Sequence, residues 1–276
     1  MLAALIQTTS SDDPRENLAR ISTQVRSAAH DGAGFILTPE VSNCVSSSRK
    51  HQNAVLQLEQ DDLSLAGYRA LAAEMGVWLS IGSLALKTGD ADGRFANRSF
   101  VIDPSGAITA RYDKIHMFDV DVTPEETYRE SDGYRPGDRA VVTDTPFGKL
   151  GLSICYDVRF AYLYRALAQA GAEILTVPAA FSPVTGQAHW ESLLRARAIE
   201  TGCYILAPAQ CGTHSTAAGK PRKTYGHSMV ISPWGEVLAD GGTDVGTVFV
   251  EIDRMKVAQA RSKIAALRHD RQFEGP

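Results

Sequence analysis

Short apolar runs alternate with amphipathic stretches along the first half of the chain. Residues 2–7 form a compact apolar run, which is typical of a buried strand. Asp13-Pro14 then opens a stretch with apolar residues at helical spacing, because proline is favoured near the first position of a helix. The pattern of this half predicts helices over 14–31 and 63–75 and strands over 2–7, 35–38, 77–84, 95–102 and 108–112.

The second half begins with a long polar segment. Residues 113–148 are rich in Asp, Glu, Pro and Gly and are predicted to be mostly loop. A loop of this length inside a compact domain is either disordered or functional. Alternation then returns and ends in a hairpin-like pattern around Pro233-Trp234-Gly235. This part is predicted to contain strands over 149–154, 173–177, 203–209, 226–232, 237–238 and 246–252 and helices over 159–170, 187–201 and 254–266.

The predicted elements favour a mixed α/β fold. Some strands are joined by hairpin turns whereas others alternate with helices, so the sheets should be mixed. Two sheets covered by helices on their outer faces fit the element count better than one doubly wound sheet. No repeat, linker or low-complexity segment interrupts residues 1–276, and we expect a single domain.

Composition and charge narrow the functional classes. Of the 276 residues 44% are hydrophobic, and the formal net charge is −4 with acidic and basic residues interspersed. Without a basic block, a nucleic-acid partner is not expected, and no apolar run reaches membrane-spanning length. The first residues turn polar too soon for a secretory signal. We therefore expect a cytoplasmic protein that acts on a small molecule.

The four cysteines differ in their surroundings. They form no CxxC pair and have no flanking histidine cluster at zinc-ligand spacing, so reduced thiols are expected. Cys44, Cys203 and Cys211 are expected to be structural. Cys155 instead follows the strand predicted at 149–154 and precedes a polar, helix-opening segment, and a helix N-terminus favours thiolate over thiol. A packed core cysteine is the commoner fate, so its partners decide the question.

Three charged residues are candidate partners of Cys155. Glu40 ends a buried strand, where partial desolvation would raise its pKa towards the range of a general base. Lys114 follows the strand at 108–112 and could stabilise an oxyanion. Glu130 lies in the long loop, and each charge taken alone could equally be solvated. Because Glu40, Lys114 and Cys155 all follow strands, we expect them to converge at one edge of the sheet.

The segments that carry these residues resemble the nitrilase superfamily of carbon–nitrogen hydrolases, whose members have a Glu-Lys-Cys triad in this order. The matching blocks are 37–40, 112–116 and 151–160, and the resemblance covers essentially the whole chain. It implies a four-layer α-β-β-α sandwich whose subunits pair through helices into a homodimer or a higher homo-oligomer. Further blocks are similar to the Nit subgroup and, within it, most like the deaminated glutathione amidases; they lie at 185–191, 195–200, 209–212 and 225–230.

The resemblance also implies a mechanism. Glu40 takes the proton of Cys155, whose sulfur attacks an amide carbon, while Lys114 and the backbone N–H of Tyr156 hold the oxyanion. Glu40 returns the proton to the leaving nitrogen, which gives ammonia and a thioester, and a water activated by Glu40 hydrolyses the thioester. Glu130 orients Glu40, Lys114 and the substrate. Neither a metal nor an organic cofactor is needed for this chemistry.

Four residues are candidates for substrate binding. Phe181 is expected to wall the pocket, and Thr185 and His189 lie around a helix start that would face the pocket mouth. For His189 a packed or capping role is an equal alternative. Arg159 either binds a substrate carboxylate or forms a structural ion pair with Asp157 or another neighbour, and the structural role is the favoured interpretation.

The substrate follows from the resemblance more than from individual residues. A carboxylate-bearing 2-oxo amide is expected, with deaminated glutathione first. The alternatives are an ω-amidase for 2-oxoglutaramate or 2-oxosuccinamate and an N-carbamoyl hydrolase. A catalytically weak binding or scaffold subunit is the alternative of another class, although the complete set of four site residues argues against it. The loop at 213–223, with Arg222-Lys223, has no assigned role, and its charges are expected to be solvated.

Overall fold

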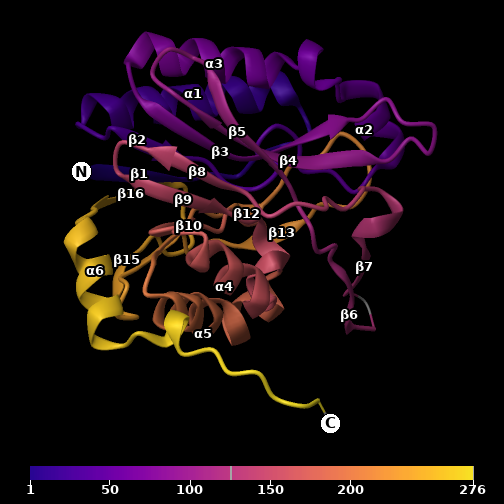
Figure 1. Ribbon diagram of the computed structural model, residues 1–276. Helices are drawn as coiled ribbons and strands as arrows, with labels where there is room; N and C mark the ends of the chain where they lie inside the picture. Colours follow the sequence, from indigo (N-terminus) through magenta and orange to yellow (C-terminus); the bar gives the residue numbers. More distant parts are fainter. Residues whose placement is uncertain (125, 276) are drawn as a thin grey trace.

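Two six-stranded sheets lie face to face in the part of the chain that the computed structural model describes, residues 1–124 and 126–275. Helices cover both outer faces, so the layers follow the order helix, sheet, sheet, helix (Figure 1). The first sheet has the order β16 (Gly246–Glu251), β1 (Leu2–Gln7), β2 (Phe35–Leu37), β3 (Trp78–Lys87), β4 (Phe95–Ile102) and β5 (Ile108–Asp113). The second has the order β15 (Val237–Asp240), β14 (Met229–Ile231), β11 (Tyr204–Ala207), β10 (Ile174–Thr176), β9 (Gly148–Leu152) and β8 (Val142–Thr145). The predicted four-layer mixed α/β fold is confirmed.

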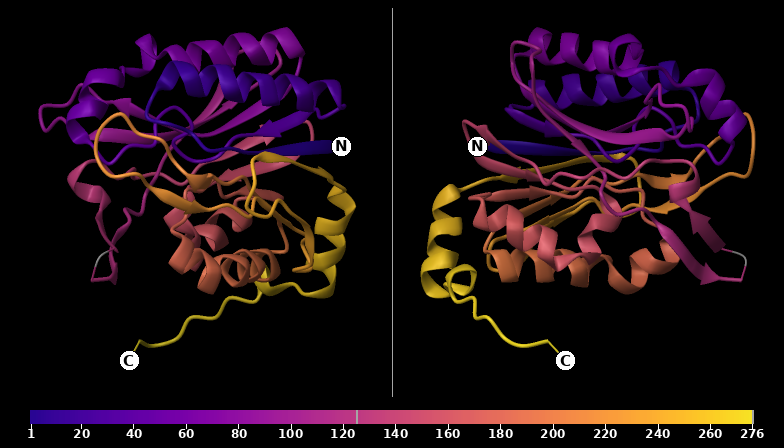
Figure 2. Two further views of the ribbon diagram at one scale, coloured as in Figure 1. Left: turned by 180° about the vertical axis from the view of Figure 1, so that it is seen from behind. Right: turned by 45° about the vertical axis from the view of Figure 1, so that its right-hand side comes forward.

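The helices occupy distinct layers. The first sheet carries α1 (Pro14–His30) and α3 (Leu63–Met75), and the second carries α4 (Ala161–Gln169) and α5 (Pro183–Thr201), as two further views show (Figure 2). A short α2 (Arg49–Val55) and the C-terminal α6 (Arg254–Lys263) lie beside the sandwich. Within residues 1–124 and 126–275, no helix is long and apolar enough to cross a membrane.

Side chains of the first strand show how the layers are held together. Successive residues of a strand point to opposite faces of the sheet. Ala3 and Leu5 of β1 therefore belong to the core between the two sheets, whereas Ala4 and Ile6 pack with α1 and α3. Since β1 is buried on both faces, it reads as a continuous apolar run in the sequence.

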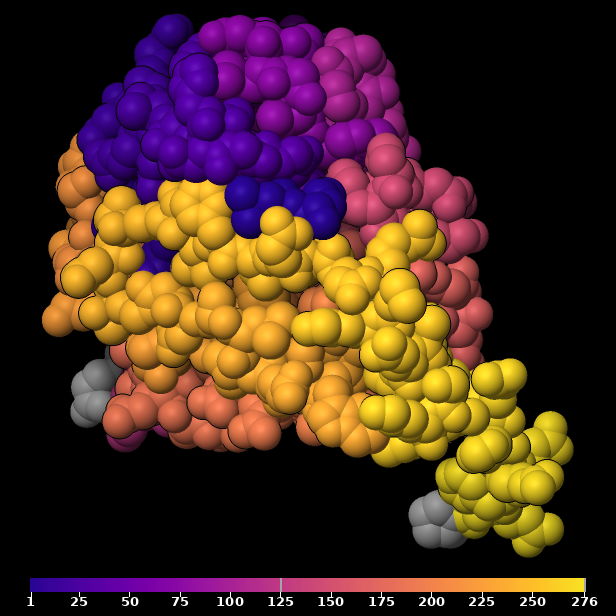
Figure 3. Space-filling model, turned by 90° about the vertical axis from the view of Figure 1, so that its left-hand side faces the viewer, coloured from indigo at the N-terminus to yellow at the C-terminus, as the bar shows by residue number. Residues whose placement is uncertain are grey.

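The chain ends close the first sheet. Strand β16 pairs antiparallel with β1, and the Met1 amino group donates to the Ile252 carbonyl at 3.1 Å. The space-filling view shows the N-terminal residues embedded beside the C-terminal segment (Figure 3). The described structure thus has its first and last strands as direct neighbours.

Strand direction determines where the site lies. Strands β1, β2 and β3 are parallel, and two antiparallel steps through β4 give β5 the same direction as β2. In the second sheet, β9, β10 and β11 are parallel. The carboxyl ends of β2 and β5 therefore lie at one edge of the first sheet, where ligand-binding loops of parallel strands gather.

The structure corrects several predicted elements. Residues 113–148 are not mostly loop: they contain the hairpin β6 (Asp119–Thr123) and β7 (Glu126–Arg129), the 3₁₀ turn η2 (Glu130–Asp132) and β8. These strands are short and partly exposed, so they lack a strong apolar pattern. Further elements without an apolar signature were missed: α2, the 3₁₀ turns η1 (Glu59–Asp61) and η4 (Ala266–Arg268), and the hairpin β12 (Cys211–Thr213) and β13 (Lys223–Tyr225).

Two helices near the site begin elsewhere than predicted. The helix expected over 187–201 starts at Pro183, directly after Ser182, because proline fits the first turn. The helix expected from 159 starts at Ala161, and the residues before it form a separate 3₁₀ turn, η3 (Cys155–Arg159). The single domain over 1–276 stays a prediction.

Candidate active site

Three charged side chains meet beyond the ends of strands. Glu40 follows β2, Lys114 directly follows β5, and Glu130 opens η2. The Lys114 ammonium donates to Glu40 Oε1 at 2.9 Å and to both oxygens of Glu130 at 3.0 and 2.8 Å. Glu40 and Lys114 are 4% and 2% exposed, so water screens these ion pairs little.

Cys155 reaches this cluster from the opposite sheet. It follows β9 and is the first residue of η3, and its thiol lies near enough to the Glu40 carboxylate for each group to shift the pKa of the other. The Ala180 N–H donates to Glu40 Oε2 at 2.8 Å, and it also lowers the pKa of the Cys155 thiol by favouring the thiolate form. The structure therefore brings together the residues expected to converge, but from two facing sheets rather than at one edge of a single sheet.

Left-handed backbone holds both loops of the cluster in position. Val41, beside Glu40, has φ 43° and Cys155 has φ 49°, and such conformations cost non-glycine residues about 1–3 kcal/mol each. Hydrogen bonds fix both: the Val41 N–H donates to Ser83 Oγ at 2.7 Å, and the Cys155 N–H donates to the Pro178 carbonyl at 2.9 Å. Gly82 lets the segments approach, because a Cβ there would lie 2.5 Å from Pro178 Cβ.

The electrostatic state of the cluster differs from the expectation. Burial alone raises the pKa of Glu40, but the Lys114 ammonium and the charge of Arg222 outweigh it, so this pKa lies below its ordinary value. Burial lowers the pKa of Lys114, yet the two carboxylates hold it well above its ordinary value. Burial and the Glu40 charge raise the pKa of Cys155, and Lys114 only partly opposes them. The site at rest therefore holds a thiol, two carboxylates and an ammonium.

The expectation that a helix N-terminus would favour the thiolate form of Cys155 is therefore wrong. The turn that Cys155 opens is a five-residue 3₁₀ helix, and α4 begins only at Ala161. A short turn has little dipole to offset the desolvation of a buried anion. The N-terminal end of η3 nevertheless offers backbone N–H groups, Tyr156 being its second residue.

Asn97 is a member of the cluster that the sequence did not reveal. Its side-chain amide donates to Glu40 Oε1 at 2.9 Å and to Glu130 Oε1 at 3.4 Å. Its backbone carbonyl accepts from the backbone N–H of Lys114 at 3.0 Å. Asn97 lies on β4, beside β5. An asparagine inside a strand has no distinguishing pattern, and only the pairing of β4 with β5 places it against the two glutamates.

Arg159 lies in the same 3₁₀ turn as Cys155, without a carboxylate partner among the described residues. Its guanidinium carbon is 5.7 Å from the Tyr156 ring centre and 5.5 Å from that of Phe181. The favoured ion pair with Asp157 is wrong, because that buried carboxylate instead accepts from the Tyr112 hydroxyl and from the backbone N–H of His116. Arg159 is thus a positive charge held by aromatic faces, a setting that suits an anionic ligand.

The other substrate-binding candidates occupy the start of α5. Phe181 is 5% exposed and packs on Trp190, with ring centres 4.7 Å apart. Thr185 lies inside the first turn of α5, where its hydroxyl donates to the Ser182 carbonyl at 3.5 Å. His189 is exposed, and its Nδ1 lies 3.4 Å from both terminal nitrogens of Arg159. His189 therefore contacts Arg159, whereas Thr185 makes a local helix contact.

Arg222 is not the solvated charge that was expected. It is half-buried, and its Nη2 donates to the Ala180 carbonyl at 2.6 Å. Lys223, its neighbour, is exposed as predicted. The difference arises because the segment between β12 and β13 folds back onto the site, which no local pattern indicates.

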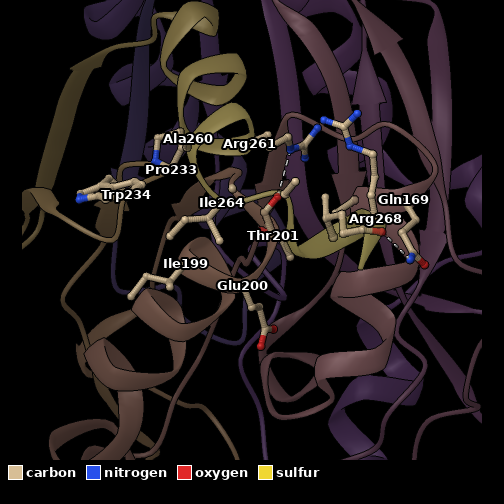
Figure 4. A pocket seen from close by; sticks show the side chains of 14 residues that line it. Gln169, Ile199, Glu200, Thr201, Pro233, Trp234, Ala260, Arg261, Ile264 and Arg268 are labelled. Atoms are coloured by element: carbon tan, nitrogen blue, oxygen red, sulfur yellow. Dashed lines mark hydrogen bonds between the residues drawn. The ribbon is translucent and has the colours of Figure 1, made fainter. Parts of the chain in front are cut away.

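A separate cavity of about 430 Å³ lies where α4, α5 and α6 meet (Figure 4). Trp234, Ile199 and Ile264 form its apolar wall, and Arg261 crosses it to donate to the Thr201 carbonyl at 3.1 Å. None of its lining residues belongs to the cluster around Cys155. Across the described residues, no three His, Cys, Asp or Glu side chains are grouped to hold a metal ion.

A fold of two facing sheets between helices, with Glu, Lys and Cys side chains meeting at their strand ends, defines a class of hydrolases. The family model described as carbon-nitrogen hydrolase matches residues 2–262, and the chain belongs to this family, within the nitrilase superfamily. It is therefore a hydrolase of carbon–nitrogen bonds of the amidase type.

Named relatives narrow the likeness. The chain is 40% identical over 269 residues to the deaminated glutathione amidase of Yersinia enterocolitica, covering 97% of this chain and 92% of that protein. Among solved structures, the C. elegans NitFhit protein has a TM-score of 0.89 at 36% identity, with 98% of this chain and 65% of that one covered. An amidase variant from Nesterenkonia sp. AN1, whose active-site cysteine carries the product of Michael addition of acrylamide, has a TM-score of 0.77 at 26% identity, with 96% and 98% covered.

Proposed function

We propose that this chain is a cysteine amidase with deaminated glutathione as its substrate. The observation that carries the proposal is the buried set of Glu40, Lys114 and Cys155, with a glutamate that accepts from the ammonium and lies beside the thiol. The substrate rests on the likeness to deaminated glutathione amidases over nearly the whole chain and on Arg159, which lies near Cys155 and has no carboxylate partner among the described residues.

The first half of the reaction forms a thioester. Because Cys155 rests as a thiol, its proton moves to Glu40 as the sulfur attacks the amide carbon, which is general-base catalysis by a positioned carboxylate. Lys114 and the Tyr156 N–H then stabilise the oxyanion, and removal of one such donor typically costs about 3–4 kcal/mol of barrier. Glu130 holds the ammonium through two hydrogen bonds, which makes it the residue that orients Lys114.

The second half returns the enzyme to its resting state. Glu40 gives its proton to the leaving nitrogen, the carbon–nitrogen bond breaks, and the amine departs. A water then loses a proton to Glu40 and attacks the thioester carbon, so that the acid is released and the thiol is restored.

The leaving group requires one correction to the expected products. Ammonia is released only from a primary amide, and both amides of deaminated glutathione are secondary. Hydrolysis at the amide that joins the 2-oxo acid to cysteine therefore releases cysteinylglycine together with 2-oxoglutarate. An assay of ammonia alone would miss this reaction.

Arg159 is the proposed anchor of a substrate carboxylate. Its guanidinium is held over Tyr156 and Phe181, and it has no protein carboxylate to displace among the described residues. A bidentate guanidinium–carboxylate pair fixes orientation as well as charge. The same anchor would serve the shorter acid 2-oxoglutaramate, so the ω-amidase function is the second candidate.

The two candidates can be compared with one assay, because both substrates yield 2-oxoglutarate. We expect kcat/KM for deaminated glutathione to exceed that for 2-oxoglutaramate about tenfold, since this needs only about 1.4 kcal/mol of differential transition-state binding to the cysteinylglycine portion. The test measures 2-oxoglutarate from both, and ammonia from glutamine and an N-carbamoyl amino acid as comparison substrates. Equal or reversed preference would favour the ω-amidase, and an inert protein with unreactive Cys155 would favour the scaffold alternative.

We also propose that the protein is a cytoplasmic homodimer paired through α4 and α5. Leu163 of α4 and Leu194 of α5 are buried inside the chain itself. Tyr162 and Ile199, which are 66% and 54% exposed, remain available on these helices. Light scattering should give twice the mass of one 29.8 kDa chain, and a monomer at micromolar concentration would contradict the proposal.

A further inference from the structure

The segment between β12 and β13 is built into the protein at several points. The His214 ring lies 2.7 Å from the Ser10 carbonyl and 2.8 Å from the Thr224 hydroxyl. Asp12 accepts from the Thr216 hydroxyl and from the backbone N–H of Ala217, both at 2.8 Å. These contacts tie the segment to the residues after β1, so the side chain of its last residue, Arg222, is held in a defined place.

Arg222 is that side chain, and it contacts the site through Ala180. Its Nη2 donates to the Ala180 carbonyl at 2.6 Å, while the N–H of Ala180 donates to Glu40 Oε2 at 2.8 Å and favours the thiolate form of Cys155. Both polar groups of this one residue are thus engaged between the arginine and the reacting pair. A shift of Ala180 would weaken the hydrogen bond that orients the Glu40 carboxylate.

The charge of Arg222 also matters to the cluster. Two carboxylates, Glu40 and Glu130, share a single ammonium, Lys114. The charged and titratable groups around Glu40 are Lys114 after β5, Cys155 in η3 and Arg222 before β13, with Glu130 reached through Lys114. Arg222 is the second cation of this set, and its charge lowers the pKa of Glu40.

We propose that Arg222 is a positioning residue for the reaction: it holds Ala180 against Glu40 and Cys155 and supplies the positive charge that balances the second carboxylate. The proposal rests on the roles given above to Glu40 and Cys155. It does not depend on which amide is the natural substrate.

A substrate anchor is the competing role for Arg222. Its Nε is buried and has no hydrogen-bond partner among the described residues, and its guanidinium carbon lies 5.8 Å from the Tyr128 ring centre. A ligand carboxylate could accept from Nε. The two roles predict different results, because an anchor acts on the KM of an anionic substrate whereas a positioning residue acts on the Glu40–Cys155 pair.

The test uses a neutral probe that needs no natural substrate. Cys155 is alkylated with iodoacetamide across the pH range and the rate is followed by mass spectrometry, in parallel with kcat and KM for deaminated glutathione. The variants are Arg222→Gln, which removes the positive charge and the guanidinium that donates to Ala180, and Arg222→Lys, which keeps the positive charge. Lys223→Gln is the matched control, since it removes an adjacent, exposed positive charge.

We expect Arg222→Gln to move the acid limb of the pH–rate profile of Cys155 alkylation to higher pH by about 0.5–1 unit, because loss of a cation raises the pKa of a carboxylate base. Its plateau rate should fall about tenfold, as expected for a lost charge-assisted hydrogen bond. Arg222→Lys should restore the limb but not the full plateau, and Lys223→Gln should change neither.

Three results would overturn the proposal. An unmoved limb in Arg222→Gln with a lowered melting temperature would show a merely structural role. A raised KM for deaminated glutathione with unchanged alkylation would make Arg222 the substrate anchor. Absence of Cys155 alkylation in the unaltered protein would refute the proposed function as well, whereas a shifted limb in a protein inert towards deaminated glutathione would refute only the substrate.

Discussion

Cys155 and Cys203 lie in regions of the molecule that share two features. Both thiols are buried, and burial raises the pKa of each. Each also has a cation nearby that opposes this rise, Lys114 for Cys155 and Arg261 for Cys203, where the Arg261 Nη2 lies 3.0 Å from the sulfur. Burial and a neighbouring positive charge therefore do not distinguish a nucleophile from a structural cysteine.

The acceptor next to each thiol distinguishes Cys155 from Cys203. Cys203 donates to the Ala172 carbonyl at 3.2 Å, and a carbonyl oxygen cannot take the proton away. Cys155 is paired with the Glu40 carboxylate, which can. Cys203 also directly precedes a regular strand, β11, whereas Cys155 has a left-handed backbone that presents its side chain to the facing sheet. A base and a presenting turn are the two features on which the proposed role of Cys155 as nucleophile rests.

Removal of each sulfur tests this contrast most strongly. Cys155→Ala should abolish release of 2-oxoglutarate from deaminated glutathione, because no other group can form the thioester. Cys203→Ala should keep most activity and lose about 1 kcal/mol of stability from a small cavity. Both variants are assayed beside a mock-purified control, and their thermal unfolding is followed by circular dichroism. Substantial turnover in Cys155→Ala would refute the mechanism.

Substitution of the charged partners should have the next largest effect. Lys114→Ala and Glu40→Gln should each lower kcat about 10²–10³-fold, since one removes an oxyanion donor and the other the proton carrier. Lys114→Ala also leaves two carboxylates unpaired, so we expect it to cost about 3–5 kcal/mol of stability. Arg261→Gln, which removes the cation beside Cys203, is the matched control and should leave kcat within about twofold of the parent's. An equal loss of kcat in Arg261→Gln would remove the contrast between the two regions.

Asn97 should have a moderate effect. Asn97→Ala removes the amide that holds Glu40 and Glu130 on one side of Lys114, and we expect kcat to fall about tenfold with KM little changed. Steady-state kinetics with deaminated glutathione measure both constants. A rise in KM at constant kcat would instead show that Asn97 contacts the substrate.

The pH profile should give the smallest but most specific signal. The base is active when ionised, and because Lys114 and Arg222 lower the pKa of Glu40, the acid limb of kcat/KM should lie below the ordinary glutamate value of 4.5. The alkaline limb should lie above the ordinary thiol value of 9.0, since the pKa of Cys155 is raised. Initial rates in buffers of constant ionic strength measure both limbs. An acid limb near neutral pH would show that burial dominates over the two cations.

Much of the architecture could be read from local patterns. Buried strands are continuous apolar runs and amphipathic helices have their own spacing, so β1, β2, α1 and α3 were predicted within a few residues. The polar hairpin β6–β7 and helix α2 escaped prediction because neither buries a continuous apolar face. Glu40, Lys114 and Cys155 were found because each follows a strand, a position that sequence alone can indicate.

By itself, the sequence determined the layers of the fold, the family and the three side chains that meet. The tertiary structure alone decided their charge states: burial was predictable, but the cations that reverse its effect on Glu40 come from Lys114 and Arg222, distant in sequence. It also decided that Asn97 joins the cluster and that Arg159 does not pair with Asp157. The physical reason is that element formation depends on neighbours along the chain, whereas electrostatic energies depend on distances between segments that only folding brings together.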